Sequence, residues 1–208
     1  MKLFNLGLPK SGTTTMHKAL EESDIKSAHW KFRTQTEDGR PGTMGFVGRR
    51  MYADYLDGKD PLVSLRHYDA ITQADVVKPP FSLWPQTDIA LLKAVRARHP
   101  DCLFVLLTRD PKKIASSMSR WKNLQRRLHA LGAPGLPPDA AVSMRRLEQW
   151  VVDHFANMRA VFGDDPRFLE FDISDNDAAG RLSVALDIKI KWWGVANVNT
   201  KNLDLETE

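Results

Sequence analysis

Short runs of apolar residues alternate along this chain with segments in which apolar residues recur every three or four positions. Runs bounded by turn-forming residues are typical of buried strands. We expect such strands at 2–6, 25–28, within 70–77, at 103–108 and at 167–171. Because strands that alternate with helices form β-α-β units, the pattern predicts an α/β fold of three layers, with a mainly parallel central sheet flanked by helices.

Helices are expected where the apolar residues follow the helical period. The expected segments are 16–20, 87–99, 110–132 and 139–163. Thr87 has the character of an N-cap for the second helix, and Asp110 caps the third, which Gly132 ends. Asp139 begins the fourth, and Gly163 stands where a C′ residue belongs.

Residues 32–66 differ from the rest of the chain. They are rich in Gly, Arg, Asp and Thr and have no sustained periodicity. Long loops inside compact domains are often functional, so we interpret this stretch as a lid or an acceptor-binding loop, with disorder as the alternative. No repeat or linker is visible, and residues 1–208 are expected to form one domain.

Composition is that of a globular protein. The chain has 208 residues, 42% of them hydrophobic, which suffices for a sizeable core. No stretch reaches the ~18 consecutive apolar residues of a membrane span, and the beginning does not read as a secretory signal. With a single cysteine, Cys102, in an apolar run, we expect a cytoplasmic protein with an inert, buried thiol.

The net charge of +4 is mild, and basic residues are densest between Arg109 and Arg127. Charge alone does not exclude nucleic acid as a partner. The recognised motifs of nucleic-acid modules are absent, however, and a small ligand with several phosphate or sulfate charges is the simpler account.

Candidate chemistry starts at residues 7–15, which read GLPKSGTTT between an expected strand and an expected helix. Gly7 and Gly12 allow a tight turn whose N–H groups approach an anion, and the helix start adds a partial positive charge. Lys10 supplies a full charge. The segment therefore predicts a phosphate-binding, P-loop-like turn, the alternative being a turn without a ligand.

This loop departs from the nucleotide-triphosphate motif G-x-x-x-x-G-K-[ST], in which Lys follows the second glycine. Here Thr13 follows Gly12, and the lysine lies upstream at Lys10. Thr14 and Thr15 add further hydroxyl groups. The loop therefore differs from that of a typical ATP- or GTP-binding protein.

A second candidate element lies farther along the chain. Arg109 follows the expected strand 103–108, and Ser117 lies two turns into the next helix. The carboxyl ends of parallel strands meet at one edge of a sheet, where the Gly7 loop also opens. A guanidinium and a hydroxyl there suit a second phosphate, although Arg109 paired with a carboxylate is the alternative.

Together these elements resemble the sulfotransferases that use 3′-phosphoadenosine 5′-phosphosulfate (PAPS). The sequence PKSGTT resembles the 5′-phosphosulfate loop of that family, and Arg109 with Ser117 eight positions later resembles its 3′-phosphate element. The resemblance implies PAPS as sulfuryl donor, a P-loop-like fold and no catalytic metal. It also implies a nucleotide-closing loop near Lys201. The implied 5′-side residues are Lys10, Ser11, Gly12, Thr13, Thr14 and Thr15.

The catalytic base is less well marked. Family members that act on phenols and steroids have Lys-Thr-His after a central strand, where this chain reads VKPP at 77–80. Carbohydrate-type members place a carboxylate after the second strand, and some bacterial-type members place a histidine there, which here is His29. We therefore expect His29 to be the base, the alternative being a histidine that only packs or lies on the surface. The remaining candidates for the base are His17, His67, Asp69 and Asp75.

The resulting expectation is transfer of a sulfuryl group from PAPS to a hydroxyl or amine of a carbohydrate, lipid headgroup or small metabolite. Lys10 would stabilise charge on the departing phosphate, and His29 would accept the proton of the acceptor. One rival hypothesis is a kinase or P-loop nucleotide-triphosphate hydrolase, and another is a catalytically silent nucleotide-binding protein. The dimerisation motif of the phenol- and steroid-type members is not visible, so the sequence predicts no oligomeric state.

Overall fold

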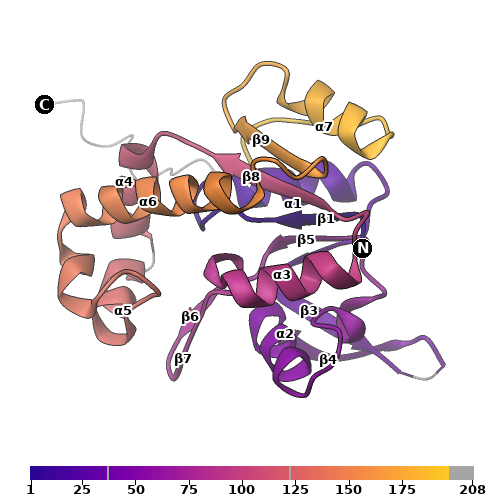
Figure 1. The fold of residues 1–208 in the computed structure, drawn as a ribbon, viewed down its shortest axis with the longest axis horizontal. Coiled ribbons are helices and arrows are strands. Elements are labelled where there is room, and N and C mark those ends of the chain that lie inside the picture. Colours follow the sequence, from indigo (N-terminus) through magenta and orange to yellow (C-terminus); the bar gives the residue numbers. More distant parts are fainter. Residues whose placement is uncertain (37, 122, 197–208) are drawn as a thin grey trace, which may run out of the picture.

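The computed structural model describes residues 1–36, 38–121 and 123–196. Its strands are β1 (Leu3–Asn5), β2 (Ser27–His29), β3 (Lys31–Gln35), β4 (Pro41–Phe46), β5 (Ala70–Gln73), β6 (Val76–Lys78), β7 (Phe81–Leu83), β8 (Leu103–Thr108) and β9 (Phe168–Asp172). Seven of them form one sheet in the order β4-β3-β2-β5-β1-β8-β9 (Figure 1). The other two, β6 and β7, form a separate antiparallel pair.

The helices lie between these strands. They are α1 (Thr13–Glu21), α2 (Val47–Leu56), α3 (Ile89–Arg98), α4 (Pro111–Arg120), α5 (Leu124–Leu131), α6 (Met144–Phe162) and α7 (Ala178–Leu186). Short 3₁₀ turns are found at Val63–Leu65, Pro85–Thr87 and Pro138–Val142.

The central sheet is mainly parallel, as predicted. Strand β1 pairs in parallel with β5 and with β8, β5 pairs with β2, and β8 pairs with β9. The antiparallel strands β3 and β4 extend the sheet beyond β2. The chain passes from β1 to β2 on one side, whereas β8 lies on the other side of β1. Binding sites in open α/β sheets form at such a point, where the strand order reverses between two neighbouring strands.

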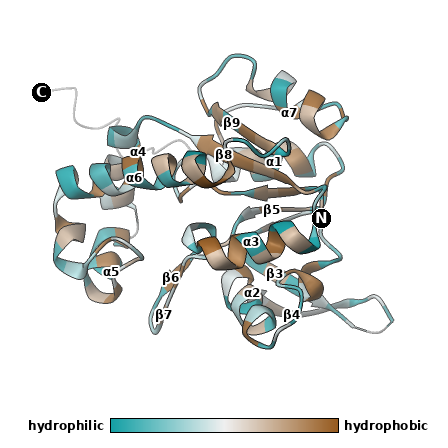
Figure 2. Ribbon diagram, viewed as in Figure 1, coloured by the Kyte–Doolittle hydropathy of each residue, from teal (hydrophilic) through white to brown (hydrophobic). Residues whose placement is uncertain are grey.

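Alternate residues of the central strands pack into two separate apolar clusters. In β1, Leu3 belongs to the cluster that contains α1 and α7, and Phe4 belongs to the cluster of α2 to α6. All six residues of β8 are buried, because both faces of this strand are covered. Figure 2 shows the hydrophobic colour running along β8 between the helices. The predicted three-layer α/β fold is therefore confirmed.

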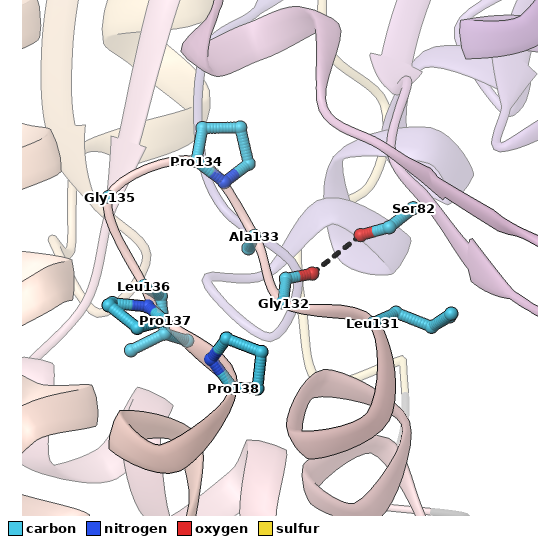
Figure 3. Close-up of a pocket in the computed structure, with 9 residues that line it drawn as sticks. All are labelled: Ser82, Leu131, Gly132, Ala133, Pro134, Gly135, Leu136, Pro137 and Pro138. Atoms are coloured by element: carbon cyan, nitrogen blue, oxygen red, sulfur yellow. Dashed lines mark hydrogen bonds between the residues drawn. The ribbon is translucent and has the colours of Figure 1, made fainter.

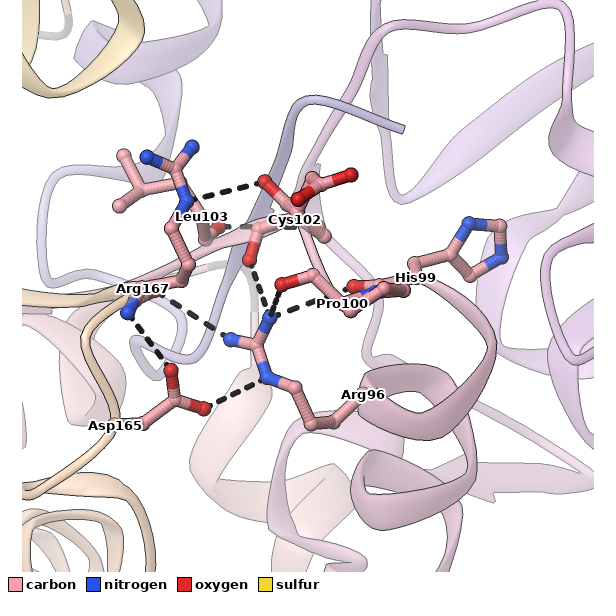
Figure 4. Close-up of polar contacts among 8 residues, drawn as sticks. Arg96, His99, Pro100, Cys102, Leu103, Asp165 and Arg167 are labelled. Carbon is pink, nitrogen blue, oxygen red and sulfur yellow. Dashed lines mark hydrogen bonds and ion pairs between the residues drawn. The ribbon is translucent and has the colours of Figure 1, made fainter.

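A polar cluster at the amino-terminal ends of β8 and β9 connects α3 to these two strands (Figure 4). The Arg96 guanidinium lies 2.7 Å from an Asp165 oxygen and donates to the Cys102 carbonyl at 2.7 Å. Cys102 itself is fully buried, and burial raises the pKa of its thiol to about 12. The predicted burial of this thiol is confirmed, and its inertness stays a prediction.

The single helix expected over 110–132 is wrong, because the chain forms two helices there. Helix α4 ends at Arg120, and α5 begins at Leu124 after Asn123, whose φ of 59° breaks the right-handed helix. The short connection keeps the spacing of the apolar residues, so the periodicity does not reveal the break.

Two predicted helix starts also shift. The N-cap of α3 is Asp88, whose carboxylate accepts the N–H three residues on, whereas the Thr87 hydroxyl bonds backward to a carbonyl. The last long helix begins after Ser143 rather than at Asp139, because residues 138–142 form a 3₁₀ turn. Gly163 ends that helix with a right-handed φ of −57°, not as a left-handed C′ residue.

The irregular loop expected over 32–66 is also wrong in its secondary structure. This stretch contains the hairpin β3–β4 and helix α2. Of the β3 residues only Phe32 is buried, so the strand lacks the regular apolar alternation that predicts a strand. Gly45 faces Phe32 so closely that a Cβ on Gly45 would lie 2.6 Å from its ring. The assignment of this stretch to acceptor binding stays a prediction.

Candidate functional site

The loop between β1 and α1 is packed too tightly for side chains at its two glycines. A Cβ on Gly7 would lie 2.6 Å from the carbonyl oxygen of Leu107 in the neighbouring strand. Gly12 has a φ of 116°, and a Cβ there would lie 2.6 Å from the Ile173 side chain. Both positions therefore require glycine. At Gly7 the adjacent Leu107 carbonyl leaves no room for a Cβ, and at Gly12 both the Ile173 side chain and the positive φ exclude one.

The second candidate element joins this loop directly. Arg109 follows the last residue of β8, and its Nη1 donates to the carbonyl oxygen of Lys10 at 3.3 Å. Helix α4 starts next, with Asp110 accepting the N–H of Lys112 at 2.8 Å. Ser117 lies two turns along this helix and is 6% exposed. The two elements, far apart in sequence, thus form one structural unit.

Both elements line a cavity of about 1320 Å³ at the carboxyl ends of the parallel strands. This exceeds the ~300–1,000 Å³ typical of small-molecule sites. The cavity is lined by residues of the loop (Pro9, Lys10, Gly12, Thr13, Thr14, Thr15), of β2 and β5 to β6 (His29, Trp30, Gln73, Asp75, Val76, Val77, Lys78), of 109–127 (Arg109, Asp110, Lys113, Ser117, Arg120, Trp121, Leu124, Arg127) and of the C-terminal part (Asp172, Ile173, Ser174, Trp193, Gly194, Val195, Ala196).

Positive charge dominates the cavity wall, where six side chains are Lys or Arg and three are Asp. A low-dielectric cleft lined by one sign of charge attracts ligands of the opposite sign. The wall is therefore suited to a ligand with several negative charges.

The sequence-predicted residues lie together, with two exceptions. Ser11 is fully buried under the loop, and its hydroxyl has no hydrogen-bond partner among the described residues. Lys201 lies outside the described residues. The predicted set that lines the cavity is Lys10, Gly12, Thr13, Thr14, Thr15, His29, Arg109 and Ser117.

The aromatic ring of Trp121, directly after the end of α4, lies beside the loop. The Nζ of Lys10 is 4.7 Å from the centre of the Trp121 ring, and the guanidinium carbon of Arg127 is 5.5 Å from it. Arg127 also donates to the Val77 carbonyl. The helical spacing of Trp121 predicts packing in a core, whereas its ring lines the cavity directly after the end of α4.

A hydrogen-bonded chain runs along another wall of the cavity. Thr13 Oγ1 donates to Gln73 Oε1 at 3.1 Å, and Gln73 Nε2 donates to Asp75 at 2.9 Å. Gln86 donates to the other oxygen of Asp75, also at 2.9 Å. Burial raises the pKa of Asp75 to about 6, against the effect of these two amide donors. Gln73 was not predicted, although its place at the carboxyl end of a strand is a usable signal.

His29 occupies the end of β2, at the edge of the same cavity. Its Nδ1 lies 3.1 Å from Thr72 Oγ1, and its Nε2 lies 3.4 Å from Thr14 Oγ1. The ring stacks on that of His17, with centroids 4.9 Å apart and an angle of 10°. Burial, and to a lesser degree His17, lowers the pKa of His29 to about 3. The ring is therefore neutral near pH 7, with one nitrogen able to accept a proton.

Of the other candidates for a base, only Asp75 lines the cavity. His17 is bound to the Ser27 hydroxyl, and His67 to the Arg33 carbonyl at 2.7 Å. Asp69 accepts the Lys26 N–H at 3.2 Å. Of the five candidate bases named from the sequence, His29 and Asp75 are therefore the two that line the cavity.

A second, shallower hollow lies beside the loop between α5 and the following 3₁₀ turn (Figure 3). It is lined by Ser82 and residues 131–138, and the Ser82 hydroxyl donates to the Gly132 carbonyl at 2.6 Å. No charged side chain is among these lining residues. It offers no group for acid-base chemistry.

The residues that the structure describes contain no group of three or more His, Cys, Asp and Glu side chains arranged to hold a metal ion. Within the same residues, every helix is too short or too polar to cross a membrane.

Comparison with known proteins adds a family-level finding. The model of a family described as a sulfotransferase domain matches residues 2–133, which is more than half of the chain. No curated protein matches the chain. The matched stretch contains β1, the loop that follows it, β8 and α4, and thus both candidate elements.

Proposed function

We propose, from the fact that this chain belongs to the sulfotransferase family, that it transfers a sulfuryl group from PAPS to a hydroxyl or amine of an acceptor. The supporting observation is the 3.3 Å hydrogen bond from Arg109 to the Lys10 carbonyl. This contact brings an ammonium-bearing loop and a guanidinium into one cavity. A nucleotide with phosphate groups at both ends of its ribose needs two such positions.

The loop fits the 5′ side of this donor. Neither Gly7 nor Gly12 has room for a Cβ, which keeps the turn tight, and the loop leads directly into the N-terminus of α1, where helices favour anions. The buried Ser11 hydroxyl lacks a partner among the described residues, and Thr14 and Thr15 line the cavity at the start of α1. We assign the 5′-phosphosulfate to this loop, with Lys10 opposite the negative charge that develops during transfer.

Arg109 and Ser117 suit the 3′-phosphate. A guanidinium forms two parallel hydrogen bonds to a phosphate, and the Ser117 hydroxyl adds a third donor from α4. Trp193 to Ala196 line the cavity, and the nucleotide contact that the resemblance implies for Lys201 falls outside the described residues.

The transfer itself breaks the bond between sulfur and the bridging oxygen of the donor and forms a bond between sulfur and the acceptor oxygen or nitrogen. The acceptor also loses a proton. We assign His29 as the base, because its ring is neutral and lies at the edge of the cavity. The low pKa makes it a weak base in the free protein. Asp75, with its pKa of about 6, is the competing assignment.

The part of the cavity next to His29 is the proposed acceptor side. Trp30 is 36% exposed there and has a φ of 52°, which is costly for an aromatic residue. Its ring stacks on Phe46 with centroids 5.8 Å apart, and Phe46 ends the hairpin β3–β4. We therefore retain residues 32–66 as a contributor to acceptor binding.

Calorimetric titration tests the donor assignment. Adenosine 3′,5′-bisphosphate, ADP and ATP are each titrated with and without magnesium. We expect metal-independent preference for the 3′-phosphorylated nucleotide, because Arg109 and Ser117 recognise only that phosphate. Preference for ATP with magnesium would indicate a kinase or nucleotide-triphosphate hydrolase. Binding of the bisphosphate without transfer to any screened acceptor would indicate a silent nucleotide-binding protein.

A further inference from the structure

Behind His29 lies a buried hydroxyl whose hydrogen bonds determine where the imidazole proton sits. Thr72 belongs to β5 and is fully buried. Its Oγ1 is 3.1 Å from the Ala28 carbonyl oxygen and 3.1 Å from His29 Nδ1. A hydroxyl has one proton to donate and can also accept a hydrogen bond.

Two arrangements of protons satisfy these distances differently. In the first, Thr72 donates to the Ala28 carbonyl and accepts a hydrogen bond from Nδ1–H, so its hydroxyl makes two bonds. In the second, Thr72 donates to an unprotonated Nδ1, which leaves its hydroxyl with one bond and takes that bond from the carbonyl. A carbonyl cannot donate, and a buried polar group left without a partner is costly. The first arrangement is therefore the more stable one.

We propose that Thr72 is a positioning residue that fixes the tautomer of His29, with the proton on Nδ1 and the lone pair of Nε2 directed toward Thr14 and the cavity. The role of this tautomer in catalysis rests on the proposed function, in which His29 is the base. The tautomer itself is a property of the ligand-free chain. It follows from the hydrogen bonds of Thr72 with Ala28 and His29.

The environment on the other side of the ring agrees with this assignment. Thr14 lines the cavity in the first turn of α1, and its hydroxyl, 3.4 Å from Nε2, can donate to the lone pair. An acceptor hydroxyl that takes the place of Thr14 then transfers its proton to Nε2. The product is an imidazolium that keeps its Nδ1–H bond to Thr72. With the proton on Nε2 instead, the ring has no lone pair to offer the acceptor.

Nuclear magnetic resonance tests the tautomer without any ligand or activity. Long-range ¹H–¹⁵N correlations distinguish Nδ1–H from Nε2–H imidazoles, and the His29→Asn variant identifies the signals of His29 among the six histidines. We expect the Nδ1–H form in the unaltered protein and a shift toward Nε2–H in Thr72→Val. Thr72→Ser, which keeps the hydroxyl, should restore Nδ1–H. An Nε2–H ring in the unaltered protein, or no change in Thr72→Val, would overturn the proposal.

Kinetics with PAPS then connect the tautomer to transfer. We expect Thr72→Val to lower kcat by roughly 10- to 100-fold, with an unchanged KM for the donor. This loss is no larger than the ~10²–10⁴-fold that a general base contributes, because the variant keeps His29 itself. Thr72→Ser should recover most of kcat. Thr87→Val, which also removes a hydroxyl hydrogen bond but lies outside the cavity lining, should keep kcat. If His29→Asn kept full activity, the base assignment would fail while the tautomer result stood.

Discussion

Arg109 donates a hydrogen bond to the backbone carbonyl of Lys10, a residue 99 positions earlier in the chain. The contact crosses from the end of β8 to the loop after β1, which are neighbouring parallel strands. It holds two cationic side chains at one edge of the sheet.

Removal of either charge should weaken nucleotide binding. Lys10→Ala and Arg109→Ala should each lower the affinity for adenosine 3′,5′-bisphosphate by roughly 10- to 100-fold, because a hydrogen bond to a charged group contributes ~1.5–3 kcal/mol. Titration calorimetry gives the affinities. Arg98→Ala, an exposed arginine at the end of α3, is the matched control. Equal losses in all three variants would mean that general charge, and not this site, binds the nucleotide.

Substitution of Gly12 should damage the loop and the fold together. In Gly12→Ala the Cβ meets the Ile173 side chain at 2.6 Å, and the φ of 116° is strained for any L side chain. We expect a loss of roughly 1–3 kcal/mol in the free energy of unfolding, measured with urea. Adding Ile173→Ala should relieve the contact but not the backbone strain. Full recovery of the free energy of unfolding in the double variant would show that backbone strain at Gly12 does not contribute to the loss.

His29 and Asp75 can be separated as candidate bases. We expect His29→Asn to lower kcat by about 10²- to 10⁴-fold with PAPS and a turned-over acceptor, and the near-isosteric Asp75→Asn to cost less than about tenfold. The pH profile of kcat/KM provides a second measurement. If Asp75 is the base, activity falls as pH drops through about 6, the pKa of its carboxyl, and Asp75→Asn abolishes turnover. These two results together would identify Asp75, and not His29, as the base.

His154 should make the protein less stable in mild acid. Its Nε2 is 2.8 Å from the Leu6 carbonyl, and burial lowers its pKa to about 4, from 6.5. Between these values the unfolded chain binds more protons than the folded one, so acidification favours unfolding. Relative to His154→Gln, the unaltered protein should lose about 2 kcal/mol of stability between pH 7 and pH 5. Urea unfolding at both pH values measures this difference, which should be zero if His154 does not titrate differently in the two states.

Cys102 should resist thiol reagents in the folded protein. Burial raises the pKa of its thiol to about 12, and the thiolate is the reactive form. At pH 8 we expect negligible labelling of the native chain and one label per chain in concentrated urea, in agreement with the single cysteine of the sequence. Rapid labelling without urea would indicate local opening at the start of β8.

The two elements proposed to bind the nucleotide were accessible from sequence because each is local. Lys10 lies in a short loop between a strand and a helix, and Arg109 follows an apolar run, so the parallel sheet alone predicts that they meet. The contribution of Trp121 was not accessible. Its spacing fits a continuous helix, and the left-handed Asn123 that ends this continuity has no signature in apolar periodicity.

The hairpin β3–β4 was missed for a different physical reason. The edge strand β4 and its neighbour β3 are largely exposed, so they need no alternation of apolar and polar residues, and one buried phenylalanine in β3 replaces the pattern. The chain from Thr13 to Asp75 depends on side-chain contacts between α1 and the end of β5. Such contacts appear only once the sheet order is known.

Strand β9 lies beyond residue 133, yet it pairs with β8 from Phe104 to Thr108, and Ile173 just after it closes over Gly12. A fragment that stops at residue 133 would carry both motifs on a sheet whose β8 edge is bare, and unpaired strand edges promote aggregation. Recombinant work therefore needs the last third of the chain even when only nucleotide binding is of interest. Exchange of that third between related proteins offers a way to change the lining residues that it contributes to the cavity, while Lys10 and Arg109 stay the same.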